Sequence, residues 1–195
     1  MIQTSLNNVS IRLKSGGHSF STATLGAEVR SAASPVMVSL LTPKTTLVPA
    51  EFFDDKHAAH YLAEVGLGLT MNECVVCSDA VEGVVAVMAI SEQCYVELQR
   101  VVPMGMRFTS PLLEGETIEK GSILHLEEDV LYVRVYKDGM QFAEAMECQS
   151  DADVLYYLAK IDEVYGIYNI YARAKGDTKR LKSLLKPIFK DLVCE

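Results

Sequence analysis

The sequence predicts an α/β fold of the mixed kind, in which helices accompany both parallel and antiparallel strands (mixed α+β). The chain is expected to consist of two similar halves. Stretches in which apolar and polar residues alternate, as they do in half-buried strands, recur along the chain. Capped segments with apolar residues three or four positions apart lie between them, as expected of helices that cover a sheet. Residues 11–20 also align without a gap with residues 133–142, so that apolar, Arg, Gly and Phe positions coincide. This repeat indicates a duplicated unit, although two amphipathic hairpins can look alike without any duplication.

The first half is expected to open with a hairpin and to continue as short strands and helices. Alternation over residues 9–14 and 18–25, on either side of Ser15-Gly16-Gly17, is typical of two strands joined by a tight turn. A helix capped by Asp54 or Asp55 should run to about Val65, where Gly66 ends it, with Phe52 and Phe53 packing on its entry. The remaining elements expected in this half are strands at 36–41, 45–48, 72–78, 83–90 and 104–109 and a helix at 91–100.

The second half shows a cleaner pattern after an expected surface loop over residues 114–121. Strands are predicted at 122–127, 130–136 and 140–147, and Asp138-Gly139 forms the last hairpin turn. Ser150 is expected to cap a helix, with Asp153 in the capping-box position. The apolar face of that helix consists of Val154, Leu155, Leu158, Ile161 and Tyr165. A strand at 167–174 and a final helix at 177–193 complete the prediction.

Composition and charge exclude several classes of function. The chain has 195 residues and a net charge of −8, from 18 Lys and Arg against 26 Asp and Glu, which disfavours nucleic acid and anionic membranes as partners. No basic segment followed by an apolar one opens the chain, and the apolar run at residues 84–90 is too short for a membrane span. Five cysteines, an odd number, favour free thiols in a reducing compartment, so we expect a cytoplasmic protein.

Four short segments carry a resemblance to a known family. They are Ser10-Ile11-Arg12-Leu13, Gly17-His18-Ser19-Phe20-Ser21, Thr45 to Pro49 with Phe53-Asp54, and Asp153 to Leu158. In these the chain resembles a family of uncharacterised bacterial proteins, the domain of unknown function 3822, whose fold is similar to that of actin-like ATPases. The resemblance implies two ribonuclease-H-like lobes, residues 1–110 and 111–195, with a cleft between them. Because the chain is short for such a fold, we expect it to be trimmed around residues 100–120.

The resemblance also implies where a nucleotide would bind. Actin-like ATPases hold phosphates on one hairpin at the start of each lobe, where an Asp organises the metal and Gly and Ser face the phosphates. The first hairpin offers Lys14, Ser15, Gly16 and Gly17 but no acid, and in the second no Ser or Thr follows Asp138-Gly139. We therefore expect no catalytic residues, no resident metal or cofactor, and a non-catalytic binding or scaffolding role. The alternatives are a nucleotide-binding protein or weak Mg-ATPase that uses these six residues, and a structural component of a homo-oligomer or an envelope-associated assembly.

Two further constellations favour structural roles. Cys74 and Cys77 have the spacing of a redox or zinc motif, but they stand alone, and residues three apart on a strand point to opposite faces. His57, His60 and Glu64 share one helix face without a fourth ligand, as expected of a solvated surface.

The end of the chain offers a candidate interaction surface. Leu181, Leu184, Leu185, Ile188 and Leu192 recur as an apolar face, and Lys179, Lys182, Lys186 and Lys190 recur on another. This basic face is either the solvated side of an ordinary cover helix or a docking surface for an acidic protein partner. Pro187 should kink or divide the helix in either case.

Overall fold

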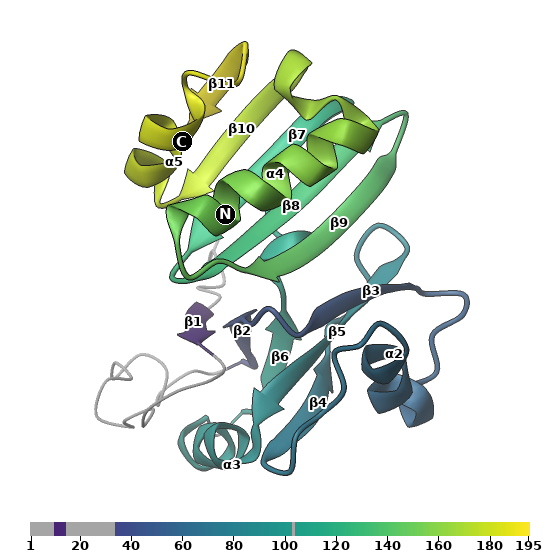
Figure 1. Ribbon diagram of the computed structural model, residues 1–195. Helices are drawn as coiled ribbons and strands as arrows, with labels where there is room; N and C mark the ends of the chain where they lie inside the picture. Colours follow the sequence, from purple (N-terminus) through teal and green to yellow (C-terminus); the bar gives the residue numbers. More distant parts are fainter. Residues whose placement is uncertain (1–9, 15–33, 103) are drawn as a thin grey trace, which may run out of the picture. The chain divides into compact units, whose positions relative to one another are not determined.

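The fold is described by a computed structural model that covers residues 10–14, 34–102 and 104–195 (Figure 1). The chain packs as two compact units. The first lies within Met1–Thr42 and Val48–Ser110, and the second consists of Pro43–Leu47 and Pro111–Glu195. Strands and helices alternate in both units, so the chain is a mixed α/β protein, as the sequence predicts.

The first unit contains a small parallel sheet with the strand order β1-β2-β6. Its strands are β1 (Ser10–Lys14), β2 (Val36–Leu41) and β6 (Met106–Thr109). Val38 lies between Ile11 on one side and Phe108 on the other, in parallel register with both. The second strand of the predicted opening hairpin, residues 18–25, lies outside the described residues, as does its turn.

A second three-stranded sheet has the order β3-β5-β4. It consists of β3 (Thr45–Pro49), β5 (Val84–Ser91) and the antiparallel β4 (Glu73–Cys77), and helix α3 (Glu92–Val101) follows, capped by Ser91. A 3-10 turn, η2 (Asp55–His57), leads into α2 (Ala58–Glu64), which buries Ala58 and Leu62 in a core with Val48.

The predicted boundaries of this helix are close, but part of its predicted packing is wrong. Asp54 accepts a hydrogen bond from the Lys56 N–H as the cap, and Gly66 follows with φ of 77°. Phe53 packs on Tyr61, with the ring centroids 6.0 Å apart. Phe52, however, is 70% exposed instead of packed, as is Val65 at the helix end with 54%, so neither extends the buried face. The short helix buries only Ala58 and Leu62. The apolar pattern of the sequence continues into the residues on either side of the helix and therefore overestimates the buried face.

The second unit is built on a five-stranded sheet with the order β11-β10-β7-β8-β9. Strands β7 (Lys120–Glu127), β8 (Val130–Lys137) and β9 (Met140–Glu147) form an antiparallel meander. Strand β10 (Tyr171–Gly176) pairs in parallel with β7, and β11 (Asp191–Cys194) pairs in parallel with β10. The three predicted strands of the meander are confirmed.

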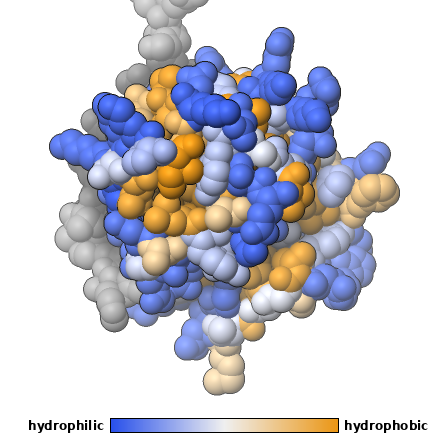
Figure 2. All heavy atoms as spheres, turned by 45° about the horizontal axis from the view of Figure 1, so that its top comes forward, coloured by the Kyte–Doolittle hydropathy of each residue, from blue (hydrophilic) through white to orange (hydrophobic). Residues whose placement is uncertain are grey.

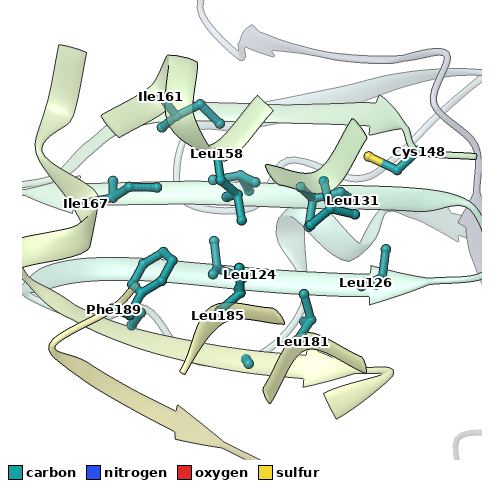
Figure 3. Close-up of a cluster of buried hydrophobic side chains, with 14 of the residues drawn as sticks. Leu124, Leu126, Leu131, Cys148, Leu158, Ile161, Ile167, Leu181, Leu185 and Phe189 are labelled. Atoms are coloured by element: carbon teal, nitrogen blue, oxygen red, sulfur yellow. The ribbon is translucent and has the colours of Figure 1, made fainter. Parts of the chain in front are cut away.

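Two helices cover one face of this sheet (Figure 1). They are α4 (Asp151–Tyr165), with the predicted capping box of Ser150 and Asp153, and α5 (Thr178–Leu185), capped by Asp177. Figure 3 shows Leu158 of α4 and Leu181 and Leu185 of α5 directed at Leu124 and Leu131 of the sheet. All five side chains are fully buried, so this core fixes the position of both helices.

The predicted final helix at 177–193 is wrong in its second half. Helix α5 ends at Leu185, and residues 191–194 form strand β11. Pro187 has no N–H to continue the helix, and beyond it Leu192 faces the core from a strand. The preceding strand also begins later than predicted, at Tyr171, because Ile167–Asn169 forms a 3-10 turn whose Tyr168 N–H donates to the Asp162 carboxylate at 2.8 Å.

Candidate functional site

The residues predicted to meet phosphates are only partly within the described chain. Lys14 is the last residue of β1, where its backbone pairs with Leu41, and Ser15, Gly16 and Gly17 lie outside the described residues. Asp138 and Gly139 form the turn between β8 and β9, with φ of 54° and 112°, and the Lys137 N–H donates to the Gly139 carbonyl at 2.9 Å. Asp138 is exposed there. Lys14 belongs to the first unit and this turn to the second.

The turn at Asp138 is not the first hairpin turn of the second unit. The hairpin that opens this unit is β7–β8, and its turn holds Glu128 and Asp129. Since successive turns of a meander lie at opposite ends of the sheet, Asp138 and Asp129 are at opposite ends of β8. The repeat in the sequence matches residues 11–20, of which 15–20 lie outside the described residues, with the second hairpin of this sheet.

The cysteine and histidine motifs contain no reactive arrangement within the described chain. Burial, with the charge of Asp55, raises the pKa of the Cys77 thiol to about 11, and burial also raises the pKa of the Cys74 thiol. Both thiols are therefore protonated at neutral pH and weak nucleophiles. His57 contacts the Asp54 carboxylate at 3.1 Å, and His60 contacts Glu64 at 3.4 Å. No group of three His, Cys, Asp or Glu side chains in the described residues could hold a metal ion.

Polar side chains line one face of the five-stranded sheet in the second unit, the face that α4 and α5 do not cover. Arg134 is 4% exposed and donates to the Glu114 carbonyl at 2.7 Å, with its guanidinium 5.9 Å from the centre of the Tyr136 ring. His125, 6% exposed, contacts Glu127 at 2.9 Å. The sequence pattern assigns these residues no functional role, since an alternating strand predicts its polar residues on a solvated face. Buried polar groups need hydrogen-bond partners, and these two side chains find theirs within the protein, as expected of a structural role.

The exposed side of α5 carries the predicted lysines. Leu181 and Leu185 are fully buried, while the opposite side of the helix is exposed. There a groove of about 630 Å³ is lined by Lys179, Lys182, Ser183, Lys186 and Pro187. We call these five residues the lysine groove. Lys190, the fourth predicted lysine, follows the helix and is exposed beside β11. Figure 2 shows hydrophobic patches bordered by hydrophilic side chains on one face of the molecule.

The lysine groove has a locally uncompensated positive charge. Seven of the 18 Lys and Arg residues, but one of the 26 Asp and Glu residues, lie between positions 173 and 190. That acid, Asp177, accepts the Arg180 N–H as the helix cap, and Asp151 of α4 holds the Arg180 side chain at 2.6 Å. Within the described residues, no carboxylate lies within ion-pair distance of the three groove lysines. Like charges three and four residues apart repel each other on a helix, so this arrangement costs stability.

The sequence pattern identifies the lysines of the groove but not its other two residues. The 3.6-residue period identifies Lys179, Lys182 and Lys186 as one face. The pattern gives Ser183 and Pro187 no part in this surface, although it predicts that Pro187 kinks or divides the helix. The helix ends just before this proline, at Leu185, and the proline ring reaches the groove surface.

Comparisons with known proteins show the fold of the chain. Neither family models nor curated proteins give a match. Among solved structures, a Bacteroides thetaiotaomicron protein "with actin-like ATPase fold and unknown function" matches with a TM-score of 0.68 and 19% identity, over 83% of this chain and 68% of that one. The cytoplasmic domain of EpsL, an inner membrane component of the type II secretion system of Vibrio cholerae, matches over 95% of this chain and 84% of that one. Its TM-score of 0.48 and 16% identity are too low to support an argument.

The chain thus has a mixed α/β structure with the actin-like ATPase fold. Within the described residues, no helix has the length and apolar character needed to cross a membrane.

Proposed function

We propose that this protein is a non-catalytic binding or scaffolding protein of the actin-like ATPase fold, which binds an acidic protein partner through the lysine groove. The observation that carries the proposal is the set of three exposed lysines on α5 and its C-cap, which have no carboxylate partner in the described chain. Their mutual repulsion costs stability in the free protein, and an acidic partner would relieve it.

The net charge of the chain does not oppose this binding at contact distance. The chain carries −8 overall and would repel an acidic partner from afar. At physiological ionic strength, however, charges are screened over about 8 Å, so the groups nearest to the partner dominate. Around the lysine groove these groups are lysines, and Arg180 beside them is already paired with Asp151.

The test uses a fluorescein-labelled peptide of eight glutamates as the probe and fluorescence anisotropy of the full chain. Replacing Lys179, Lys182 and Lys186 together with serine should weaken binding by about tenfold or more, since each exposed ion pair contributes little alone. Lys137→Ser, an exposed lysine beside the β8–β9 turn, is the matched control and should bind as the unmodified chain does. Equal binding by all three proteins, or none by any, would contradict the proposal.

A second candidate function follows from the fold, since the matching protein has an actin-like ATPase fold. In this alternative Lys14, Ser15, Gly16 and Gly17 with Asp138 and Gly139 hold a magnesium nucleotide, and Lys14 contacts phosphate. Calorimetry with ATP and Mg²⁺ tests it. Micromolar binding that Asp138→Ala weakens would support this function, while no heat and no thermal shift at millimolar nucleotide would exclude it.

The proposal includes the finer assignments that the resemblance implies. These are membership of the family of domain of unknown function 3822, a bacterial origin, a cytoplasmic location and two ribonuclease-H-like lobes at residues 1–110 and 111–195. The compact units divide the chain in nearly the same way, except that residues 43–47 pack with the second unit. A role in a homo-oligomer stays open, and light scattering that shows a monomer at every concentration would contradict it.

A further inference from the structure

The lysine groove combines charge with apolar surface. Its lysines contribute long aliphatic stems, since a lysine on a helix lays its methylene groups along the surface and keeps its ammonium in water. Pro187 adds an exposed apolar ring at the end of the helix. The groove therefore has an apolar floor made by stems and ring, and cationic groups at its rim.

The spacing of the cations defines the length of what fits. Lys179 and Lys186 lie seven residues apart, or about 10.5 Å along the axis at the rise of an α-helix. Lys182 lies between them, so the positive charges extend over about two helical turns, from the start of α5 to its C-cap at Lys186. A ligand of this length is a short peptide segment rather than a single carboxylate, and the groove is an open one that an apolar side chain can reach from solvent.

The apolar part of the groove favours a carboxylate-bearing peptide over a lone phosphate group. The lysines pair with either anion as point charges, so the cations alone do not discriminate between them. The apolar floor would add nothing to the binding of a phosphate, whereas it would bury a hydrocarbon side chain.

We infer that the lysine groove recognises an acidic segment that carries an apolar anchor residue flanked by carboxylates. The anchor packs on Pro187 and the lysine stems, and the carboxylates pair with Lys179, Lys182 and Lys186. This inference rests on the proposed function and specifies the chemistry of the partner.

The first experiment compares three labelled peptides on the unmodified full chain. One has a central phenylalanine between glutamates, the second has serine in place of phenylalanine, and the third has glutamine in place of every glutamate. The phenylalanine peptide should bind about tenfold more tightly than the serine peptide, the ratio expected for burying one such side chain. Equal affinity of these two peptides overturns the inference but leaves the proposed function intact. Failure of both acidic peptides to bind overturns both.

The second experiment separates charge from apolar surface within the groove. The double variant Lys182→Met and Lys186→Met keeps an unbranched apolar stem at both positions and removes the charge, whereas Lys182→Ser and Lys186→Ser together remove both. The double methionine variant should keep the preference for phenylalanine over serine and lose most of its salt dependence, and the double serine variant should lose both. Pro187→Ser should reduce the phenylalanine preference alone, with Lys137→Met as the control. A phenylalanine preference that survives the double serine variant and Pro187→Ser places the anchor elsewhere and overturns the inference.

Discussion

At the scale of single residues, Gly176 shows how closely strands β10 and β7 of the five-stranded sheet approach each other. Its φ is 75°, and a Cβ atom there would overlap the carbonyl oxygen of Leu126, which lies opposite it in the parallel register. The next residue, Asp177, donates its N–H to the same oxygen at 2.7 Å and then caps α5. The glycine thus permits the contact that starts the helix bearing the lysine groove.

Gly176→Ala should therefore destabilise the protein by about 2 kcal/mol or more, through both backbone strain and overlap. The comparison is Gly166→Ala, where φ is 65° but a Cβ would meet nothing within 4 Å. That change should cost roughly 1 kcal/mol, for the left-handed backbone alone. Urea unfolding measures both, and equal losses would show that the overlap at Leu126 is relieved by movement.

Cys148 is a second residue with a measurable consequence, in the pH dependence of stability. Its side chain is fully buried, and burial, followed by the charge of Asp153, raises the pKa of the thiol to about 11. The unfolded chain ionises this thiol above about pH 8.5. A raised pKa in the folded state means that the contribution to stability is complete below the unfolded pKa and is lost as the pH rises toward 11.

The unmodified chain should therefore lose more free energy of unfolding between pH 7 and pH 10 than Cys148→Ala does. Urea unfolding at the two pH values measures the difference, and the other ionising groups cancel in the comparison. A variant with the same pH dependence as the unmodified chain would show that Cys148 ionises alike in both states.

At the scale of secondary structure, the capping box sets the start of α4. The Ser150 hydroxyl accepts the Asp153 N–H at 3.3 Å, and the Asp153 carboxylate accepts the Ser150 N–H at 2.8 Å. Ser150→Ala should lower the free energy of unfolding by about 1 kcal/mol. Ser150→Thr keeps the hydroxyl and should lose little. Thermal or urea unfolding distinguishes them, and a stable alanine variant would mean that the helix start is fixed by its core contacts instead.

The same scale shows what could be predicted from the sequence. The strands of the meander and α4 were predicted closely, because alternation, the turn at Asp138-Gly139 and the Ser150 cap are all local signals. The end of the chain was not, because the apolar spacing that continues through Leu192 suits a helix as well as a strand that follows Pro187. The order of strands in each sheet depends on pairings between distant residues, such as Ala172 with Ser122, which local patterns do not encode.

The candidate site was predictable to a similar extent. The lysines are predictable because a spacing of three and four residues places them on one face of a helix. The contribution of Pro187 required knowing that α5 stops at Leu185, and the lack of carboxylate partners depended on Asp151 being engaged by Arg180, 29 residues away in the sequence.

At the scale of the whole molecule, the charge distribution predicts an unusual salt dependence. A net charge of −8 repels an acidic probe over long distances, while the lysine groove attracts it at contact. At an ionic strength of 0.1 M the screening length is about 10 Å, and at 0.01 M it is about 30 Å. Lowering the salt first strengthens the local attraction and then exposes the probe to the repulsion of the whole chain.

Binding of the octaglutamate peptide should thus tighten as the salt falls toward about 0.1 M and level off or weaken toward about 0.01 M. Anisotropy titrations at several salt concentrations give this profile. If the logarithm of the affinity instead rises linearly as the logarithm of the salt concentration falls, over the whole range, the groove does not sense the remaining charge of the chain.

The meander of the second unit also has a consequence for the order in which the chain assembles. Strands β7, β8 and β9 are joined by short turns, so they can pair as soon as residue 147 has left the ribosome. Strand β10 must return across α4 to reach β7, and β11 must wait for α5. During synthesis the nascent sheet therefore grows in one direction, from its β9 edge toward β11, and the free side of β7 stays open until residues 171–176 arrive.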